Sequence, residues 1–169
     1  MIISRAILAV GLAAISISSA KAADAPACAS FAWSIAREQT AFAAPKLSAL
    51  ASGSALPSEA GAAQLTLKPA SEIALPVPSE RPAKPDTFSG FVTATVPAAG
   101  TYQVTLSDEA WIDVSQDGRS TLKPTAHSGK VGCPDVRKSV RFALNAGPAT
   151  IEISRAARPQ IKLGLLKAE

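Results

Sequence analysis

The clearest pattern in this chain is an alternation of hydrophobic and polar residues in its central third. Residues 91–96 and 102–106 carry apolar side chains at every second position, the period of a β-strand with one buried face. Residues 97–100, Pro-Ala-Ala-Gly, predict a turn between them. Residues 111–114 continue the alternation, so this stretch predicts three consecutive strands.

Alternation returns on both sides of the central stretch. Residues 72–78 alternate too, but their prolines cannot donate to a ladder, so we expect them at a sheet edge or in a loop that continues to residue 86. About eight short strands with no helix between them predict a mainly β fold, an antiparallel β-sandwich or jelly roll. The flanking strands are predicted at residues 64–68, 139–144, 149–154 and 160–165.

One N-terminal amphipathic helix is predicted, over residues 30–44. Phe31, Ile35 and Phe42 fall on one stripe of a 3.6-residue period, Ser30 suits an N-cap, and a proline follows the last residue. Because a single helix cannot bury its stripe alone, we expect it to dock on the sandwich.

The first 22 residues have the features of a cleavable secretory signal peptide: a basic residue, an apolar run and small residues at the end. The run is shorter than the ~20 residues of a spanning helix, so we expect a periplasmic or secreted protein without a membrane span after cleavage. A retained anchor is the alternative. The predicted parts are a signal peptide at 1–22, a helix and Ala/Ser-rich connector at 23–63, and a β-sandwich domain at 64–169. The connector is either a flexible linker or an extended strap.

The net charge of the chain bears on which partners it can bind. Cleavage would remove two of the 17 basic residues and none of the 13 acidic ones, leaving a net charge of +2. Such a small excess does not favour nucleic acid as a partner.

The two cysteines, Cys28 and Cys133, predict a disulfide that ties the N-terminal segment to the β domain. A metal pair and a nucleophilic cysteine are the alternatives, but neither residue has a second ligand at metal spacing.

Catalytic motifs are absent from the sequence. His127, the one histidine, lies in the polar segment 123–135, and spacing defines no catalytic partner for it. One imidazole cannot form the usual iron or zinc sites, so no catalytic residue, metal or cofactor is assigned. We keep His127 as a candidate contact, since a long polar loop is where a binding surface is expected.

Four acidic residues lie within ten positions: Asp108, Glu109, Asp113 and Asp117. Loop carboxylates of this kind can hold calcium in sandwich domains. The segment lacks the acidic third position of an EF-hand loop, however. Asp117 also precedes Gly118, a pair that favours a type I′ hairpin turn.

The few aromatic residues matter because a ring can stack on the apolar face of a sugar. Ile112 and Val114 are predicted to share one face of their strand, with Trp111 and Asp113 on the other. If Trp111 faces outward, it forms a sugar platform with Asp113, near Tyr102 on the neighbouring strand. If it faces inward, it is the core tryptophan, which we favour because a buried tryptophan adds much apolar area to a small core.

Residues 100–107, GTYQVTLS, followed by residues 111–114 and Asp117-Gly118, resemble the middle strands of secreted jelly-roll modules. The pre-peptidase C-terminal domains and the protective-antigen-type sugar-binding sandwiches are similar in pattern. The resemblance implies a β-sandwich binding domain with Trp111, Asp113 and Asp117 as contacts.

The whole layout also resembles a group of small exported proteobacterial proteins, some of which are labelled homogentisate dioxygenase. That label implies iron held by two histidines and a carboxylate, which the single His127 does not provide, and the chain is far too short for that enzyme. The resemblance covers CASFAWSIAREQTAFAAP, GTYQVTLSDEAWIDV and GCPDVRKSVRF.

Three classes of function follow from the sequence. The first is a non-enzymatic exported module that binds a cell-envelope ligand or protein partner, for example a glycan. The alternatives are an enzyme of the labelled dioxygenase type and a structural or chaperone-like envelope protein. The candidate ligand-binding residues are Tyr102, Trp111, Asp113, Asp117 and His127.

Overall fold

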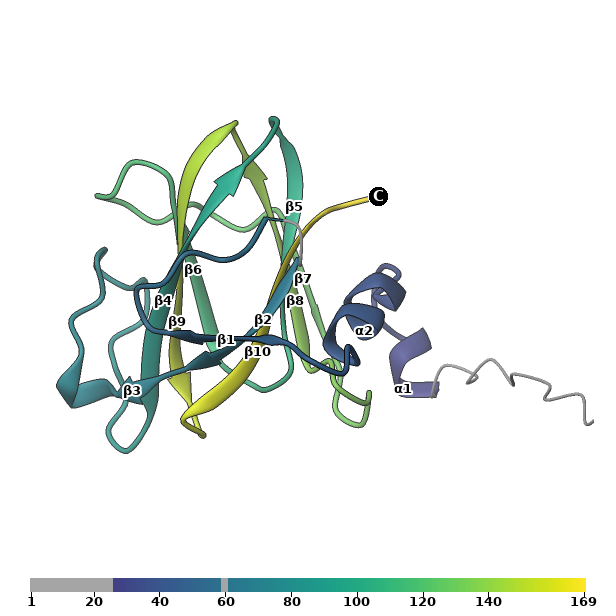
Figure 1. Ribbon diagram of the computed structural model, residues 1–169, viewed down its shortest axis with the longest axis horizontal. Helices are drawn as coiled ribbons and strands as arrows, with labels where there is room; N and C mark the ends of the chain where they lie inside the picture. Colours follow the sequence, from purple (N-terminus) through teal and green to yellow (C-terminus); the bar gives the residue numbers. More distant parts are fainter. Residues whose placement is uncertain (1–25, 59–60) are drawn as a thin grey trace, which may run out of the picture.

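The protein is built from two β-sheets packed face to face, with a pair of short helices at one side (Figure 1). The structure is a computed structural model that describes residues 26–58 and 61–169, so the predicted signal peptide lies outside the described residues. The mainly β, sandwich-like class predicted from the alternation is confirmed. The sheets contain ten strands instead of about eight.

One sheet has six strands, all antiparallel to their neighbours except for the first pair. The extra strand β1 (Ser48–Ala51) lies in the Ala/Ser-rich connector and pairs in parallel with β2, so this part of the connector is a sheet edge. The strand order is β1, β2 (Ala62–Thr66), β10 (Gln160–Lys167), β5 (Gly100–Leu106), β8 (Lys138–Leu144) and β7 (Ala126–Gly129).

The second sheet has four antiparallel strands. After the short strand β3 the chain makes a 3₁₀ turn, η1 (Ala70–Glu72). As predicted for the proline-containing segment that follows, residues 73–87 form no strand. The strand order is β3 (Lys68–Pro69), β4 (Phe88–Val96), β9 (Gly147–Ala156) and β6 (Trp111–Ser115).

The main core lies between the two sheets and is made by the inward side chains of nearly every strand. Burial of these apolar groups is the dominant favourable term in folding. The core therefore uses the positions that the period-two pattern indicated. Side chains with no exposed surface include Leu65, Val92, Val104, Leu106, Val114, Ile151, Ile153 and Leu163.

A smaller apolar cluster lies on the outward side of the six-stranded sheet, under helices α1 (Pro26–Ala29) and α2 (Ala36–Phe42). We call residues 26–42 the cap. Phe31, Ile35 and Phe42 are buried there, as their spacing predicted.

The predicted helix over residues 30–44 is only partly correct, because residues 30–35 are not helical and α2 begins at Ala36. The backbone N–H of Ala32 donates to Ser128 Oγ of β7, and Trp33 Nε1 donates to Ser139 Oγ of β8. Ser30 does not cap α2, since its hydroxyl donates to the carbonyl of Ala27. Tertiary hydrogen bonds thus replace part of the helix.

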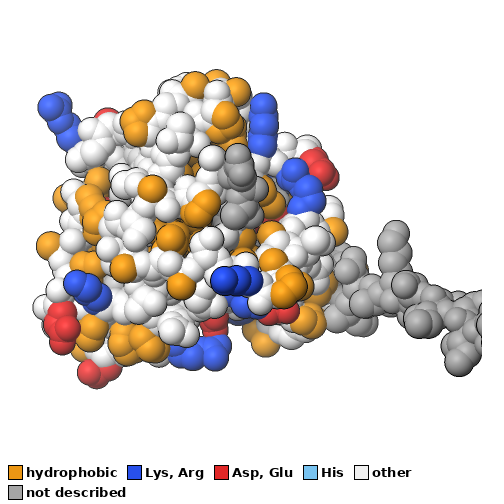
Figure 2. Space-filling model, viewed as in Figure 1, with side chains coloured by type: hydrophobic (Ala, Val, Ile, Leu, Met, Phe, Trp, Pro, Cys, Tyr) orange, Lys and Arg blue, Asp and Glu red, His pale blue; other side chains and the backbone are white. Residues whose placement is uncertain are grey.

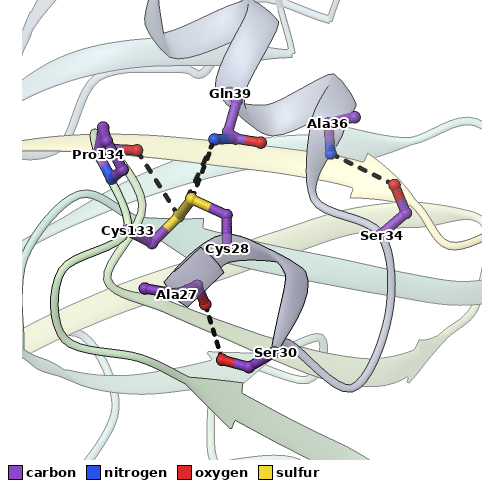
Figure 3. Close-up of a disulfide and its surroundings, with 8 residues drawn as sticks. All are labelled: Ala27, Cys28, Ser30, Ser34, Ala36, Gln39, Cys133 and Pro134. Carbon is purple, nitrogen blue, oxygen red and sulfur yellow. Dashed lines mark hydrogen bonds between the residues drawn. A yellow bond between two sulfur atoms is a disulfide. The ribbon is translucent and has the colours of Figure 1, made fainter. Parts of the chain in front are cut away.

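The predicted disulfide joins Cys28 of α1 to Cys133, which follows β7 (Figure 3). Both sulfur atoms belong to the buried cluster under the cap, and the side-chain amide of Gln39 on α2 donates to Cys28 Sγ at 3.3 Å. The bond therefore links the cap covalently to the six-stranded sheet. Among the described residues, no helix is long and apolar enough to cross a bilayer.

The disulfide is expected to contribute substantially to stability because it closes a loop of about 105 residues. Replacing both Cys28 and Cys133 by Ser should lower the free energy of unfolding by about 2–5 kcal/mol, measured by urea denaturation without reductant. Ser71→Ala, an exposed serine in η1, serves as the control. A loss below about 1 kcal/mol would show that the cap is held by its apolar and polar contacts alone.

Candidate functional site

Four side chains form a compact block on the outward face of the four-stranded sheet. Trp111 and Asp113 of β6 lie directly opposite Ser154 and Glu152 of β9, respectively. Because successive strand residues point to opposite faces, all four lie on the side away from the core. Trp111 is half-buried and absent from the core between the sheets, so the favoured prediction of a core tryptophan is wrong and the outward alternative holds.

A segment that we call the strap, residues 73–82, covers this block. Its backbone suits the position, because Pro76 and Pro78 have no N–H to leave unpaired. Val77, between them, is buried and donates its backbone N–H to Glu152 Oε1 at 2.8 Å. Figure 1 shows the region of β3, η1 and the strap on the side of the molecule opposite the helices.

Asp113 is the hydrogen-bonding centre of the block and is only 3% exposed. Its Oδ2 accepts from the hydroxyl of Ser79 at 2.6 Å and from the backbone N–H of Glu80 at 3.2 Å. Its Oδ1 accepts from Trp111 Nε1 at 3.0 Å. One buried carboxylate therefore fixes both the strap and the orientation of the indole ring.

Two cations lie over the indole ring of Trp111. The guanidinium carbon of Arg81 is 4.1 Å from the ring centroid, and Lys138 Nζ is 5.2 Å from it. Lys138 is also bonded to the carbonyl of Ala110 and to Glu109. Arg81, on the strap, is exposed and forms no salt bridge with a carboxylate in the described part of the chain.

Two polar atoms of the block are buried and have no hydrogen-bond partner among the described residues: Glu152 Oε2 and Ser154 Oγ. Glu152 is 1% exposed and Ser154 is 2% exposed. Burial raises the pKa of Glu152, and the nearby Asp113 carboxylate raises it further, against the opposing effect of the Val77 N–H. Unsatisfied buried acceptors cost about 1–3 kcal/mol each, so these two atoms are a local cost to the stability of the folded state.

The space beside the block is a hollow of about 200 Å³ between the strap and the sheet. Ser154 and Ser89 line it from the sheet, and Ser79 and Arg81 line it from the strap. The apolar part of the lining comes from Ile73, Leu75, Val77 and Pro78. The hollow and the indole ring share Arg81, so together they form one candidate binding site.

The structure does not bring the other predicted contacts to this site. Tyr102 is buried in the core between the sheets, where its hydroxyl donates to the carbonyl of Ala98. His127 is exposed on β7, in the other sheet. Segment 123–135, predicted as a polar loop, contains that edge strand and Cys133.

Asp117 lies in a turn after β6, but the predicted type I′ hairpin is wrong. Strands β6 and β7 belong to different sheets, and of the two central residues only Gly118 has a positive φ, 65°. Hydrogen bonds from the backbone and hydroxyl of Ser120, and from the backbone of Arg119, hold the pKa of Asp117 well below its usual range.

The four clustered acids do not converge. Asp108 pairs with Arg158, and Glu109 pairs with Arg137 and Lys138. In the described part of the chain, no three His, Cys, Asp or Glu side chains are grouped so that they could hold a metal ion.

The sequence analysis missed several residues of the site, among them Arg81, Glu152 and Ser154. Glu152 and Ser154 did carry a signal, because together with Thr150 they occupy the polar positions of an alternating strand. Their pairing with Asp113 and Trp111 depends on β6 lying beside β9, which the local pattern does not contain.

The fold defines a class, a two-sheet β-sandwich, and the candidate site on it is polar and aromatic. No protein-family model, curated protein or solved structure matches the chain.

The raised pKa of Glu152 predicts a specific pH dependence of stability. Since the folded-state pKa lies above the unfolded value, stability from this group is fully present at low pH. It is lost as the pH rises from about 4.5 through the folded-state pKa. Glu152→Gln imitates the protonated carboxyl group, so its stability advantage over the native protein should grow between pH 4 and pH 8.

Thermal unfolding across that pH range measures this effect. Glu72→Gln, at an exposed glutamate, should follow the native curve. Parallel curves for Glu152→Gln and the native protein would show that Glu152 does not titrate as its burial implies.

Proposed function

We propose that this protein is an exported, non-enzymatic β-sandwich module that binds a cell-envelope glycan on the outward face of its four-stranded sheet. The observation that carries the proposal is the placement of Trp111. Its ring is half-buried at the surface, and its Nε1 is held by the buried carboxylate of Asp113.

The geometry supports a binding role because the ring is fixed before any ligand arrives. Asp113 is anchored by Ser79 and Glu80, so the indole loses little freedom on binding, and preorganisation of this kind increases affinity. A ring face with adjacent hydroxyl groups matches a pyranose, which has an apolar face and a rim of hydroxyls. Ser154 and Ser79 supply those hydroxyl groups.

The disulfide supports the exported location, because disulfides persist in oxidising compartments such as the periplasm and the extracellular space. On the face shown in Figure 2, the Lys and Arg side chains lie at separate points among hydrophobic and other side chains. This arrangement favours recognition of a ligand by local contacts over attraction by a broad electrostatic potential of one sign.

Binding of the purified protein to a panel of envelope oligosaccharides, measured by isothermal titration, tests the proposal. Trp111→Ala should weaken binding at least about tenfold, or ~1.4 kcal/mol, because it removes the stacking surface. Cooperative unfolding should remain, since the ring lies outside the core. Trp111→Phe should bind with intermediate affinity because it retains an aromatic face.

Trp33 offers a matched control, since it also lies under an arginine, with Arg141 at 4.2 Å from its ring centroid. It belongs to the cap, on the other sheet, where it bonds to Ser139. Trp33→Ala should lower stability and leave glycan affinity unchanged. Equal affinity losses in the two tryptophan variants, or no loss in Trp111→Ala, would contradict the proposed site.

A further inference from the structure

The chemistry of the Trp111 block indicates the charge of the group that it receives. The face of an indole ring is electron-rich and attracts cations, more strongly when the cation is desolvated. Two carboxyl groups lie near the ring: Asp113 accepts from the indole Nε1 at the ring edge, and Glu152 lies opposite Asp113 across the strands. Neither forms a salt bridge with a Lys or Arg among the described residues.

The unpartnered atoms of the block also favour a positively charged ligand. Ser154 Oγ is buried beside the ring and lines the hollow without a partner in the described part of the chain. Glu152 Oε2, two residues earlier on the same face of β9, also lacks one. A donor with a positive charge would satisfy the hydroxyl and compensate the carboxyl groups, whereas an anionic ligand would be repelled by them.

The protein already places a cation of its own at this point. The guanidinium of Arg81 lies 4.1 Å from the centroid of the Trp111 ring and also borders the hollow. The Arg81 side chain forms no hydrogen bond and no salt bridge with the described residues. Its contact with the Trp111 ring is therefore its principal restraint. An exposed side chain held so weakly can be displaced by a competing cation.

We propose that the ligand is an amino sugar with a free ammonium group, which replaces the Arg81 guanidinium over Trp111 and donates to Ser154. This inference rests on the proposed function, since it specifies the glycan. Trp111 stacks on the sugar, Ser154 accepts from the ammonium, and Asp113 and Glu152 supply the negative charge. The hollow of about 200 Å³ provides room for the ammonium group beside the ring.

A matched pair of ligands tests the inference: the β-1,4-linked tetramer of glucosamine and its fully N-acetylated counterpart, in which each charged amine is replaced by a neutral acetamide. Titrated into the native protein at equal salt, the glucosamine tetramer should bind about tenfold more tightly, because its ammonium group donates to Ser154 with a positive charge that compensates the buried carboxyl groups. Ser154→Ala and Glu152→Gln should each reduce this preference. The control Ser71→Ala should not.

Removing the Arg81 side chain, which competes with the ligand for the Trp111 ring, should strengthen binding. Arg81→Ala should bind the glucosamine tetramer several times more tightly than the native protein, because the guanidinium no longer competes for the ring, although Lys138 Nζ remains 5.2 Å from its centroid. Arg119→Ala, at an exposed arginine in the turn after β6, should leave the affinity unchanged. Weaker binding in Arg81→Ala would overturn the displacement and make Arg81 a direct contact.

The outcomes separate this inference from the proposed function. Equal affinity for the two tetramers, both sensitive to Trp111→Ala, would overturn the amine preference and retain the glycan module. Absence of binding to these tetramers and to every other envelope glycan would overturn both. A trilysine peptide that bound at Trp111 while the glucosamine tetramer did not would overturn the amino sugar in favour of a protein partner.

Discussion

The structure depends on excluding water from both faces of each sheet. The inward faces meet each other, as in any sandwich, but long stretches of the outward faces are buried as well, under the cap on one side and the strap on the other. These outward faces carry polar residues, and a buried polar group is costly unless it is hydrogen-bonded. The covering segments therefore have to supply donors and acceptors as well as apolar surface.

The two coverings meet this requirement in different ways. Under the cap, Glu38 accepts from Gln103, which in turn accepts from Arg141. Under the strap, Asp113 has three donors, but Glu152 Oε2 and Ser154 Oγ have none among the described residues. A disulfide adds a covalent link only on the cap side. Glu38 Oε2, under the cap, likewise has no partner in the described part of the chain, so the strap side leaves two buried polar atoms unsatisfied and the cap side leaves one.

Trp111 shows which features of the protein follow from the local sequence pattern and which follow from tertiary contacts. The alternation placed Ile112 and Val114 on one face and Trp111 and Asp113 on the other, and the structure agrees, but it did not determine which face is the inner one. The preference for a core tryptophan considered apolar area alone. It neglected the indole N–H, which needs an acceptor when it is buried and finds one in Asp113, two residues along the same face.

The sequence by itself determined the mainly β class, which residues of a strand share a face, and the cysteine pair, because the period of two and the cysteine count are local properties. Only the tertiary structure decided that β6 lies beside β9, that the strap crosses both, and that tertiary bonds to Ser128 and Ser139 interrupt the predicted helix. These contacts join segments far apart in the chain. Their formation depends on which strands pair and how loops close, and a pattern within one segment does not encode either.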